Sequence, residues 1–185
     1  MGSIRGGDVE YLENLCKLML RLDARAPTVA ELTGVPLHRV RKIAKEIGAT
    51  LRGGQLPAGR EWFTKYGSAQ HMWCSAFYVM FTQTKAMHVS PPEAMLFAYS
   101  RLRDHFSEGA NTSIDRAFHL LRLIDNGQIT PRTCAACCAV YVVERLEMLN
   151  DRDHCPFCRA ASKQSHHRHR TTILGSGLSA FSTPS

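Results

Sequence analysis

The chain has 185 residues and a formal net charge of +7, enough length for one core with a small metal-stapled module beside it. Its longest nearly apolar run, residues 72–81, is shorter than the ~20 residues of a membrane-spanning helix, and residues 1–8 lack the pattern of a secretory signal. We therefore expect a cytoplasmic protein that makes no membrane contact.

Hydrophobic spacing predicts a mainly α-helical fold. The expected helices cover, in chain order, residues 8–24, 29–33, 36–47, 68–86, 91–105 and 114–126. Ser90 and Glu93 have the spacing of a capping box at the start of the fifth helix, and Gly127 closes the sixth. The β-branched residues 139–143 predict one short strand.

Residues 27–48 have the pattern of a helix-turn-helix. Gly34 permits a positive φ at the turn, and Val35, Val40 and Ile43 would pack the two helices together. The polar side chains of the second helix would then face outward, where Arg can reach guanine edges or phosphates and Lys can meet phosphates. These candidate DNA-binding residues are His38, Arg39, Arg41, Lys42 and Lys45. An ordinary helical hairpin with a solvated basic face is the alternative.

Four cysteines form two C-x2-C pairs separated by seventeen residues, a spacing typical of a four-thiolate Zn²⁺ site. The expected ligands are Cys134, Cys137, Cys155 and Cys158, and four sulfurs would leave no position for water, which describes a structural metal. Two disulfides or a redox-active dithiol are the alternatives. The adjacent Cys138 is expected to be a spare thiol, because a C-x3-C turn is the less common geometry.

Positive charge is concentrated in two segments. Residues 27–60 hold six basic and two acidic side chains, a net +4, and residues 155–185 hold four basic and no acidic ones, again +4. Nucleic acid is the obvious polyanion, because each phosphate neutralised by Lys or Arg releases counterions. The basic residues of the second segment are therefore further candidate DNA contacts: Arg159, Lys163, Arg168 and Arg170.

These features predict three parts along the chain. Residues 1–130 would form a helical domain that binds DNA and, by the arguments below, a partner. Residues 131–160 would form a zinc-ribbon-like module with four cysteine ligands, and residues 161–185 a disordered basic tail. Cys16 and Cys74 lie on apolar helical faces and are expected to be buried. His71 is expected to be a packed or hydrogen-bonded core residue.

The order of several short stretches adds a family resemblance. The stretches are Ala24-Arg25, the helix-turn-helix with Lys45-Glu46, Leu56-Pro57, Trp62-Phe63, His71 with Cys74, Arg116-Ala117-Phe118, Leu121-Arg122, Gly127 and the two cysteine pairs. Together they span residues 9–160 and resemble FlhC, the zinc-containing subunit of the FlhD–FlhC bacterial flagellar activator. The cysteine quartet at the end of a helical chain is the most specific element.

The resemblance implies a DNA-binding transcriptional activator with one structural Zn²⁺ per chain. Such a subunit assembles with FlhD into a heterohexamer, binds double-stranded promoter DNA upstream of class-two flagellar operons and recruits σ70 RNA polymerase. The adjacent Cys137-Cys138 pair and the His-rich run 166–170 depart from the family pattern. An FlhC-like activator of conjugative-transfer genes is one alternative, and a zinc-ribbon adaptor that does not read DNA is another.

An enzyme is not expected. The sequence shows no paired carboxylates, nucleophile elbow or phosphate loop, and an all-thiolate zinc activates no water. The middle helices carry more large apolar side chains than a small domain comfortably hides, so we expect a partner subunit to cover some of them. These residues are Met72, Trp73, Phe77, Met80, Phe81, Met95, Leu96, Phe97, Phe118, Leu120 and Leu121.

Overall fold

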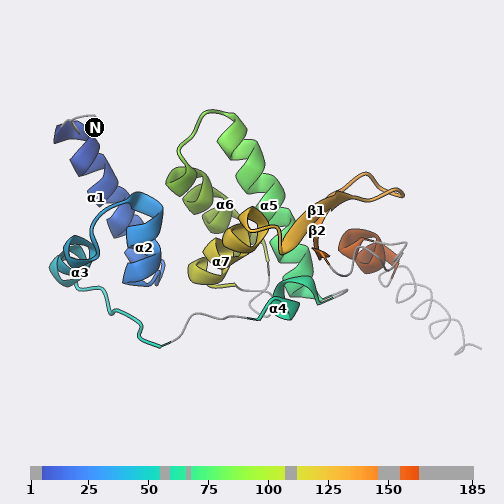
Figure 1. Ribbon diagram of the computed structural model, residues 1–185, viewed down its shortest axis with the longest axis horizontal. Helices are drawn as coiled ribbons and strands as arrows, with labels where there is room; N and C mark the ends of the chain where they lie inside the picture. Colours follow the sequence, from blue (N-terminus) through green and yellow to red (C-terminus); the bar gives the residue numbers. More distant parts are fainter. Residues whose placement is uncertain (1–5, 55–58, 66–67, 107–111, 146–154, 163–185) are drawn as a thin grey trace, which may run out of the picture.

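The computed structural model describes residues 6–54, 59–65, 68–106, 112–145 and 155–162, and it is mainly helical with one two-stranded sheet (Figure 1). The helices are α1 (Gly6–Arg21), α2 (Ala26–Thr33), α3 (Leu37–Glu46), α4 (Glu61–Thr64), α5 (Ala69–Ala86), α6 (Pro91–His105) and α7 (Ile114–Asp125). The strands are β1 (Ile129–Thr133) and β2 (Val140–Glu144), and a further helical run covers residues 156–162. No helix in the described ranges has both the length and the apolarity to cross a bilayer.

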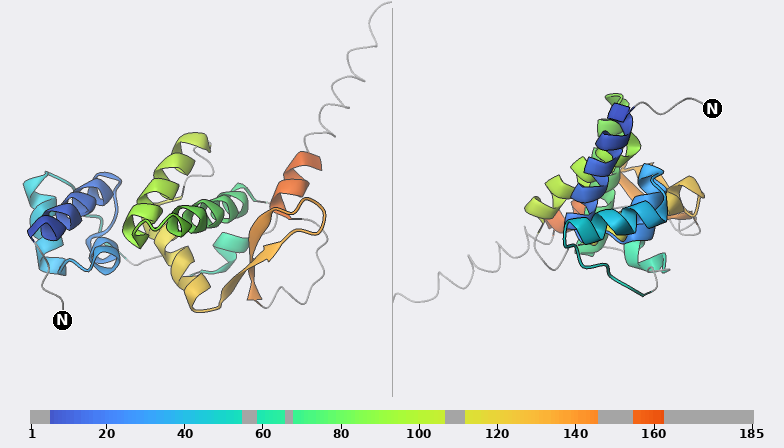
Figure 2. Two further views of the ribbon diagram at one scale, coloured as in Figure 1. Left: turned by 90° about the horizontal axis from the view of Figure 1, so that it is seen from above. Right: turned by 90° about the vertical axis from the view of Figure 1, so that its left-hand side faces the viewer.

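The first three helices form a group that we call the N-terminal lobe, and α4–α7 with the sheet form the body (Figure 2). Within the lobe α1, α2 and α3 contact one another. Gly34 ends α2 with φ 70°, and its N–H donates to the Ala30 carbonyl, so a residue that tolerates the left-handed region is needed at this turn. The turn therefore has the positive φ that the sequence predicts.

Helix α5 is the centre of the body, where it contacts α4, α6, α7 and β2. Trp73 on α5 is buried, stacks on Phe77 at 5.2 Å and meets Tyr99 of α6 edge-on at 6.1 Å. The predicted capping box of α6 is confirmed, because the Ser90 N–H donates to Glu93 Oε2 at 3.2 Å and the reciprocal bond is present. Buried apolar side chains run as one continuous cluster from α1 to β2.

The two strands pair antiparallel, with Pro131 opposite Val142. Both backbone polar groups of Val142 bond to side chains of α5 and therefore point away from β1. Pro131 thus faces a position at which no ladder hydrogen bond is made, and its missing N–H is not needed.

The predicted mainly α fold and its six helices are confirmed. The structure adds helix α4, strand β1 and the helical run 156–162. Four residues are too few to show helical periodicity, and Pro131 argues against a strand. Cys16 and Cys74 are fully buried as expected, and burial raises the pKa of both thiols.

The chain itself hides most of the large apolar side chains that the sequence analysis assigns in part to a partner. Six of the eleven are buried, namely Trp73, Phe77, Met95, Phe118, Leu120 and Leu121, and four more are half-buried. Phe97 is the exception at 50% exposed. The abundance of these residues is therefore explained by the core of the body.

Candidate metal centre and nucleic-acid interface

The first cysteine pair lies in the loop that joins β1 to β2. The Cys134 N–H donates to the Ala139 carbonyl and the Cys138 N–H donates to the Cys134 carbonyl, both at 2.9 Å. These two bonds close a tight turn, and Cys138 occupies the left-handed region in it with φ 60°. The turn buries Cys134 and leaves Cys137 and Cys138 exposed.

The second pair lies at the start of the helical run 156–162. Cys155 immediately precedes this run and is fully buried. The Cys158 N–H, one helical turn later, donates to Cys155 Sγ at 3.4 Å. A C-x2-C sequence at a helix start therefore brings its two sulfurs to the same side.

The four sulfurs meet in one place, and all lie within 4.8 Å of one another. The Sγ atoms of Cys134 and Cys158 are 3.9 Å apart, and those of Cys137 and Cys155 are 3.4 Å apart. A disulfide needs about 2.05 Å, so the four are free thiols. Tetrahedral Zn–S bonds of about 2.3 Å place neighbouring sulfurs roughly 3.8 Å apart, which is close to these separations. The donor set and its spacing fit a structural Zn²⁺.

The pKa shifts of three of the four thiols also fit a metal site. Backbone N–H groups, first that of Cys137 and then that of Cys155, lower the pKa of Cys134 to about 6. Hydrogen bonds with neighbouring thiols, first that of Cys137, raise the pKa of Cys158 to about 12, and burial raises that of Cys155. Sulfurs this close cannot all ionise unless a cation neutralises them. A bound metal would therefore release protons, and its affinity would fall as the pH falls.

A polar clamp attaches the metal-binding hairpin to the body. His71 Nε2 donates to the Val142 carbonyl at 2.6 Å, which fixes the tautomer with hydrogen on Nε2. The Val142 N–H donates to Ser75 Oγ at 3.2 Å, and the Ser75 hydroxyl donates to the His71 carbonyl at 2.8 Å. The two residues are one helical turn apart on α5 and bond the outer edge of β2. His71 is the hydrogen-bonded core residue that the sequence predicts, whereas a small polar residue such as Ser75 gives no signal in a sequence.

Helix α3 exposes most of the predicted DNA-binding residues. It turns Val40, Ile43 and Ala44 into the core. The opposite face carries four exposed side chains, His38, Arg41, Lys42 and Lys45, none of which forms a hydrogen bond or ion pair with another described residue.

Arg39 differs from the others. The sequence predicts that it faces outward, but its side chain is 34% exposed and is held by two carboxylates. Its Nε and Nη2 both lie 2.7 Å from Glu13 Oε1 on α1, and Nη1 lies 3.7 Å from Glu46. Arg39 therefore joins α3 to α1.

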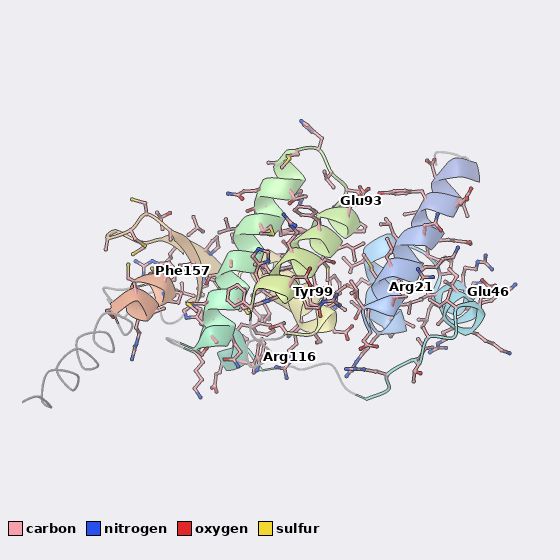
Figure 3. All side chains as sticks on the ribbon, turned by 180° about the vertical axis from the view of Figure 1, so that it is seen from behind. Arg21, Glu46, Glu93, Tyr99, Arg116 and Phe157 are labelled. Atoms are coloured by element: carbon pink, nitrogen blue, oxygen red, sulfur yellow. The ribbon has the colours of Figure 1, made fainter. Side chains whose placement is uncertain are left out.

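The remaining candidate contacts belong to the C-terminal basic segment. Arg159 is half-buried in the run 156–162, and its N–H donates to the Cys155 carbonyl at 3.2 Å. Lys163, Arg168 and Arg170, and with them the tail beyond Ser162, lie outside the described residues. Figure 3 shows Phe157, beside the cysteines, and Glu46, at the end of α3, at opposite ends of the molecule.

Comparison with known proteins identifies the family. The model of the family described as "Flagellar transcriptional activator (FlhC)" matches residues 8–171. Proteins named "Flagellar transcriptional regulator FlhC" are similar to the chain: that of Cupriavidus metallidurans is 26% identical over 70% of this chain and 62% of its own length, and that of Erwinia tasmaniensis is 27% identical over 84% and 89%. That of Verminephrobacter eiseniae is 27% identical over 70% of this chain and 72% of its own length.

The chain belongs to the FlhC family, as the resemblance in its sequence indicates. This is a family of transcriptional regulators, so the expectation that the chain is not an enzyme is confirmed by its membership.

The metal centre predicts one Zn²⁺ per chain, measured by plasma mass spectrometry of the purified protein. Replacing Cys134, Cys137, Cys155 or Cys158 with Ser should reduce metal content and soluble yield, because binding free energy is folding free energy in small zinc modules. Cys138→Ser is the matched control and should keep full occupancy. If Cys138→Ser lost the metal while Cys137→Ser retained it, the ligand set would be wrong.

The clamp on Val142 predicts that α5 stabilises the metal-binding hairpin. His71→Leu leaves the buried Val142 carbonyl without a donor and should lower the free energy of unfolding by about 1–3 kcal/mol. It should also speed metal loss to a chelator, and Ser75→Ala should act in the same direction.

Thr82→Val is the control for the clamp, because the Thr82 hydroxyl bonds only to carbonyls of its own helix, those of Tyr78 and Val79. It should leave the chelation rate unchanged. A destabilised His71→Leu protein that releases metal at the wild-type rate would show that the clamp and the metal centre are not coupled.

The contacts of Arg39 predict that this residue stabilises the fold, whereas the exposed Arg41 does not. Arg39→Ala should lower the free energy of unfolding slightly, because it removes the partly exposed ion pair that joins α3 to α1. Arg41→Ala should change it by less than about 0.5 kcal/mol. Denaturant unfolding followed by circular dichroism measures both. A stability change for Arg39→Ala that persists in a Glu13→Gln background would argue against the pair as its cause.

Proposed function

We propose that this FlhC-family chain binds promoter DNA and acts with an FlhD-type partner to recruit σ70 RNA polymerase to flagellar operons. The observation that carries the proposal is the exposed face of α3, where Arg41, Lys42 and Lys45 have no acidic partner among the described residues. Family membership supplies the second support, since the family is described as flagellar transcriptional activators.

The α2–turn–α3 segment suits a helix-turn-helix role. Its second helix is anchored by a buried apolar stripe and by the Arg39–Glu13 pair, so that its outer face is free for a ligand. A helix of this kind can lie in the major groove, where Arg reads base edges and Lys meets phosphates. His38 lies in the first turn of α3, the part of a recognition helix that contacts bases.

The metal module would supply a second, weaker contact. In this proposal Cys134, Cys137, Cys155 and Cys158 hold one structural Zn²⁺, which fixes the start of the helical run 156–162. Arg159 lies in that run, and Lys163, Arg168 and Arg170 follow it in a segment with no acidic residue. Such a segment suits phosphate contacts, which position a protein on DNA without reading its sequence.

The partner proposal rests on the family and on the remaining exposed apolar side chains. In an FlhD–FlhC heterohexamer the chain would present residues 1–130 to DNA and partner and residues 131–160 as the zinc module. The large apolar side chains that the described surface leaves exposed include Val9, Leu18, Met87 and Phe97. Their burial against an FlhD-type subunit would remove this apolar area from water.

The proposed role of α3 predicts that Arg41→Ala/Lys42→Ala/Lys45→Ala weakens promoter binding without lowering stability. Each lost phosphate contact should also reduce the salt dependence of binding by about one unit of slope. The matched control removes the same charge from exposed residues of the body, Lys65→Ala/Lys85→Ala/Arg101→Ala, and should bind almost as the wild type. Affinity is measured by fluorescence anisotropy on flagellar promoter duplexes over a range of salt concentrations.

A footprint is measured in excess non-specific competitor, with and without a co-expressed FlhD-type protein. It distinguishes a sequence-specific DNA-binding protein from one that binds DNA by charge alone and from an adaptor that does not read DNA. Protection that survives the competitor and sharpens with the partner supports the proposal, because charge-only binding is lost under these conditions. Equal affinity for the α3 triple variant and the wild type would move recognition away from α3. Absence of any footprint would favour an adaptor that does not read DNA.

A further inference from the structure

Asp115, near the start of α7, is the one fully buried carboxylate among the residues that the structure describes. It is 4% exposed, while the other buried polar residues are neutral side chains such as Thr33, Ser75 and Thr84. Removing a carboxylate from water costs several kcal/mol unless charged and hydrogen-bonding partners compensate. Its partners therefore indicate what this residue does.

Those partners come from the N-terminal lobe. The Arg25 N–H donates to Asp115 Oδ1 at 3.0 Å, and the Arg25 guanidinium Nε lies 3.7 Å from Oδ2. The same guanidinium donates through Nη1 to the Gly54 carbonyl at 2.8 Å. Asp115 thus bonds the start of α2 to the start of α7, and the Arg25 side chain bonds in turn to Gly54 in the segment that leaves the lobe.

Two helix N-termini meet at this carboxylate. Arg25 is the N-cap of α2, and no side chain of α2 caps that end. Asp115 is the second residue of α7, whose own N-cap is Ser113. The positive ends of both helix dipoles favour a negative charge here. Asp115 therefore supplies from α7 the acceptor that the start of α2 lacks.

Two other polar contacts between lobe and body, in the described part of the chain, are exposed. Glu31 of α2 pairs with Arg122 of α7 at 3.3 Å, and both side chains are about half exposed. The hydroxyls of Tyr11 and Ser90 are 3.4 Å apart on the surface. Water and salt weaken such contacts, and apolar burial does not depend on direction. At Asp115 the carboxylate itself is buried, the hydrogen bond that it accepts from the Arg25 N–H is directional, and the Arg25 guanidinium adds a positive charge 3.7 Å away.

We propose that Asp115 is the positioning residue that fixes the orientation of the N-terminal lobe, and with it α3, relative to the body that carries the metal centre. Helix α3 and the cysteine cluster lie at opposite ends of the molecule, so a small rotation of the lobe displaces α3 widely (Figure 3). The effect on DNA binding rests on the proposed function, whereas the effect on lobe orientation does not.

The experiment measures the distance between lobe and body in the full-length, metal-loaded protein. Spin labels carried by non-natural amino acids at Arg21 of α1 and Gln83 of α5, both exposed, leave every cysteine in place. The variants are Asp115→Ala, Asp115→Asn and Arg25→Ala, where the last keeps the backbone N–H bond and removes the guanidinium. Glu31→Gln is the matched control, because it breaks the exposed pair between the same two helices.

The wild type and Glu31→Gln should give one narrow distance distribution. Asp115→Ala should broaden or shift it, and should raise the exchange rate of the Arg25 amide hydrogen by at least about tenfold. The distance distributions of Asp115→Asn and Arg25→Ala should lie between those of the wild type and Asp115→Ala, because both variants can keep the hydrogen bond from the Arg25 N–H. If Asp115→Ala fails to fold, Asp115→Asn and Arg25→Ala carry the test.

An unchanged distribution and exchange rate in a folded, metal-loaded Asp115→Ala protein would overturn the proposal, as would an equal effect of Glu31→Gln. The DNA arm is scored separately on the footprinted promoter. If the wild-type protein shows no footprint, the proposed function is refuted and the proposal on lobe orientation is not affected. A broadened distribution that costs no affinity, in a protein that does bind, refutes the link between orientation and recognition.

Discussion

Hydrogen bonds between the backbone of Val142 and the side chains of His71 and Ser75 attach the metal-binding hairpin to the helical body. A two-stranded sheet is marginal in water by itself, and its outer edges leave polar groups unpaired. His71 and Ser75 occupy one of these edges, so α5 takes the place of a third strand. The hairpin is thereby held at one end by side chains of α5 and at the other by the cysteine cluster. Each attachment lowers the conformational entropy that is lost when the other forms, because a hairpin fixed at its base holds its loop sulfurs in a nearly constant position.

Much of this architecture could be predicted from the sequence, for identifiable reasons. Helical periodicity, the capping box at Ser90 and the positive φ at Gly34 are local signals, and a C-x2-C turn is also local. The parts that could not be predicted depend on contacts between distant residues. Pro131 argues against a strand until the partner position is known to make no ladder bond. Arg39 and Arg41 both flank Val40, and only the location of α1 reveals that Glu13 binds Arg39 and not Arg41.

The number of large apolar side chains in α5, α6 and α7 does not predict whether a partner covers them. A count cannot distinguish a core from an interface, because both bury the same residue types. The stacked pair of Trp73 and Phe77, with Tyr99 against it, uses these side chains within the body. Few large apolar side chains remain exposed in the described part of the chain, among them Val9, Leu18, Met87 and Phe97.

At the junction of lobe and body, apolar burial and hydrogen bonding have different effects: burial holds the two parts together, and hydrogen bonds fix their orientation. The apolar cluster is continuous across it, so hydrophobic burial alone would hold the two parts together. A buried ion pair stabilises a fold little more than an apolar pair of equal volume, and often less. The stability of the junction therefore does not account for a carboxylate at position 115. Asp115 instead restricts the orientation of the lobe, because one of its oxygens accepts from the Arg25 N–H while the other faces the Arg25 guanidinium. In the proposed function, the basic face of α3 and Arg159 near the cysteine cluster (Figure 3) contact one DNA duplex, and a fixed orientation of the lobe would keep these two parts in register.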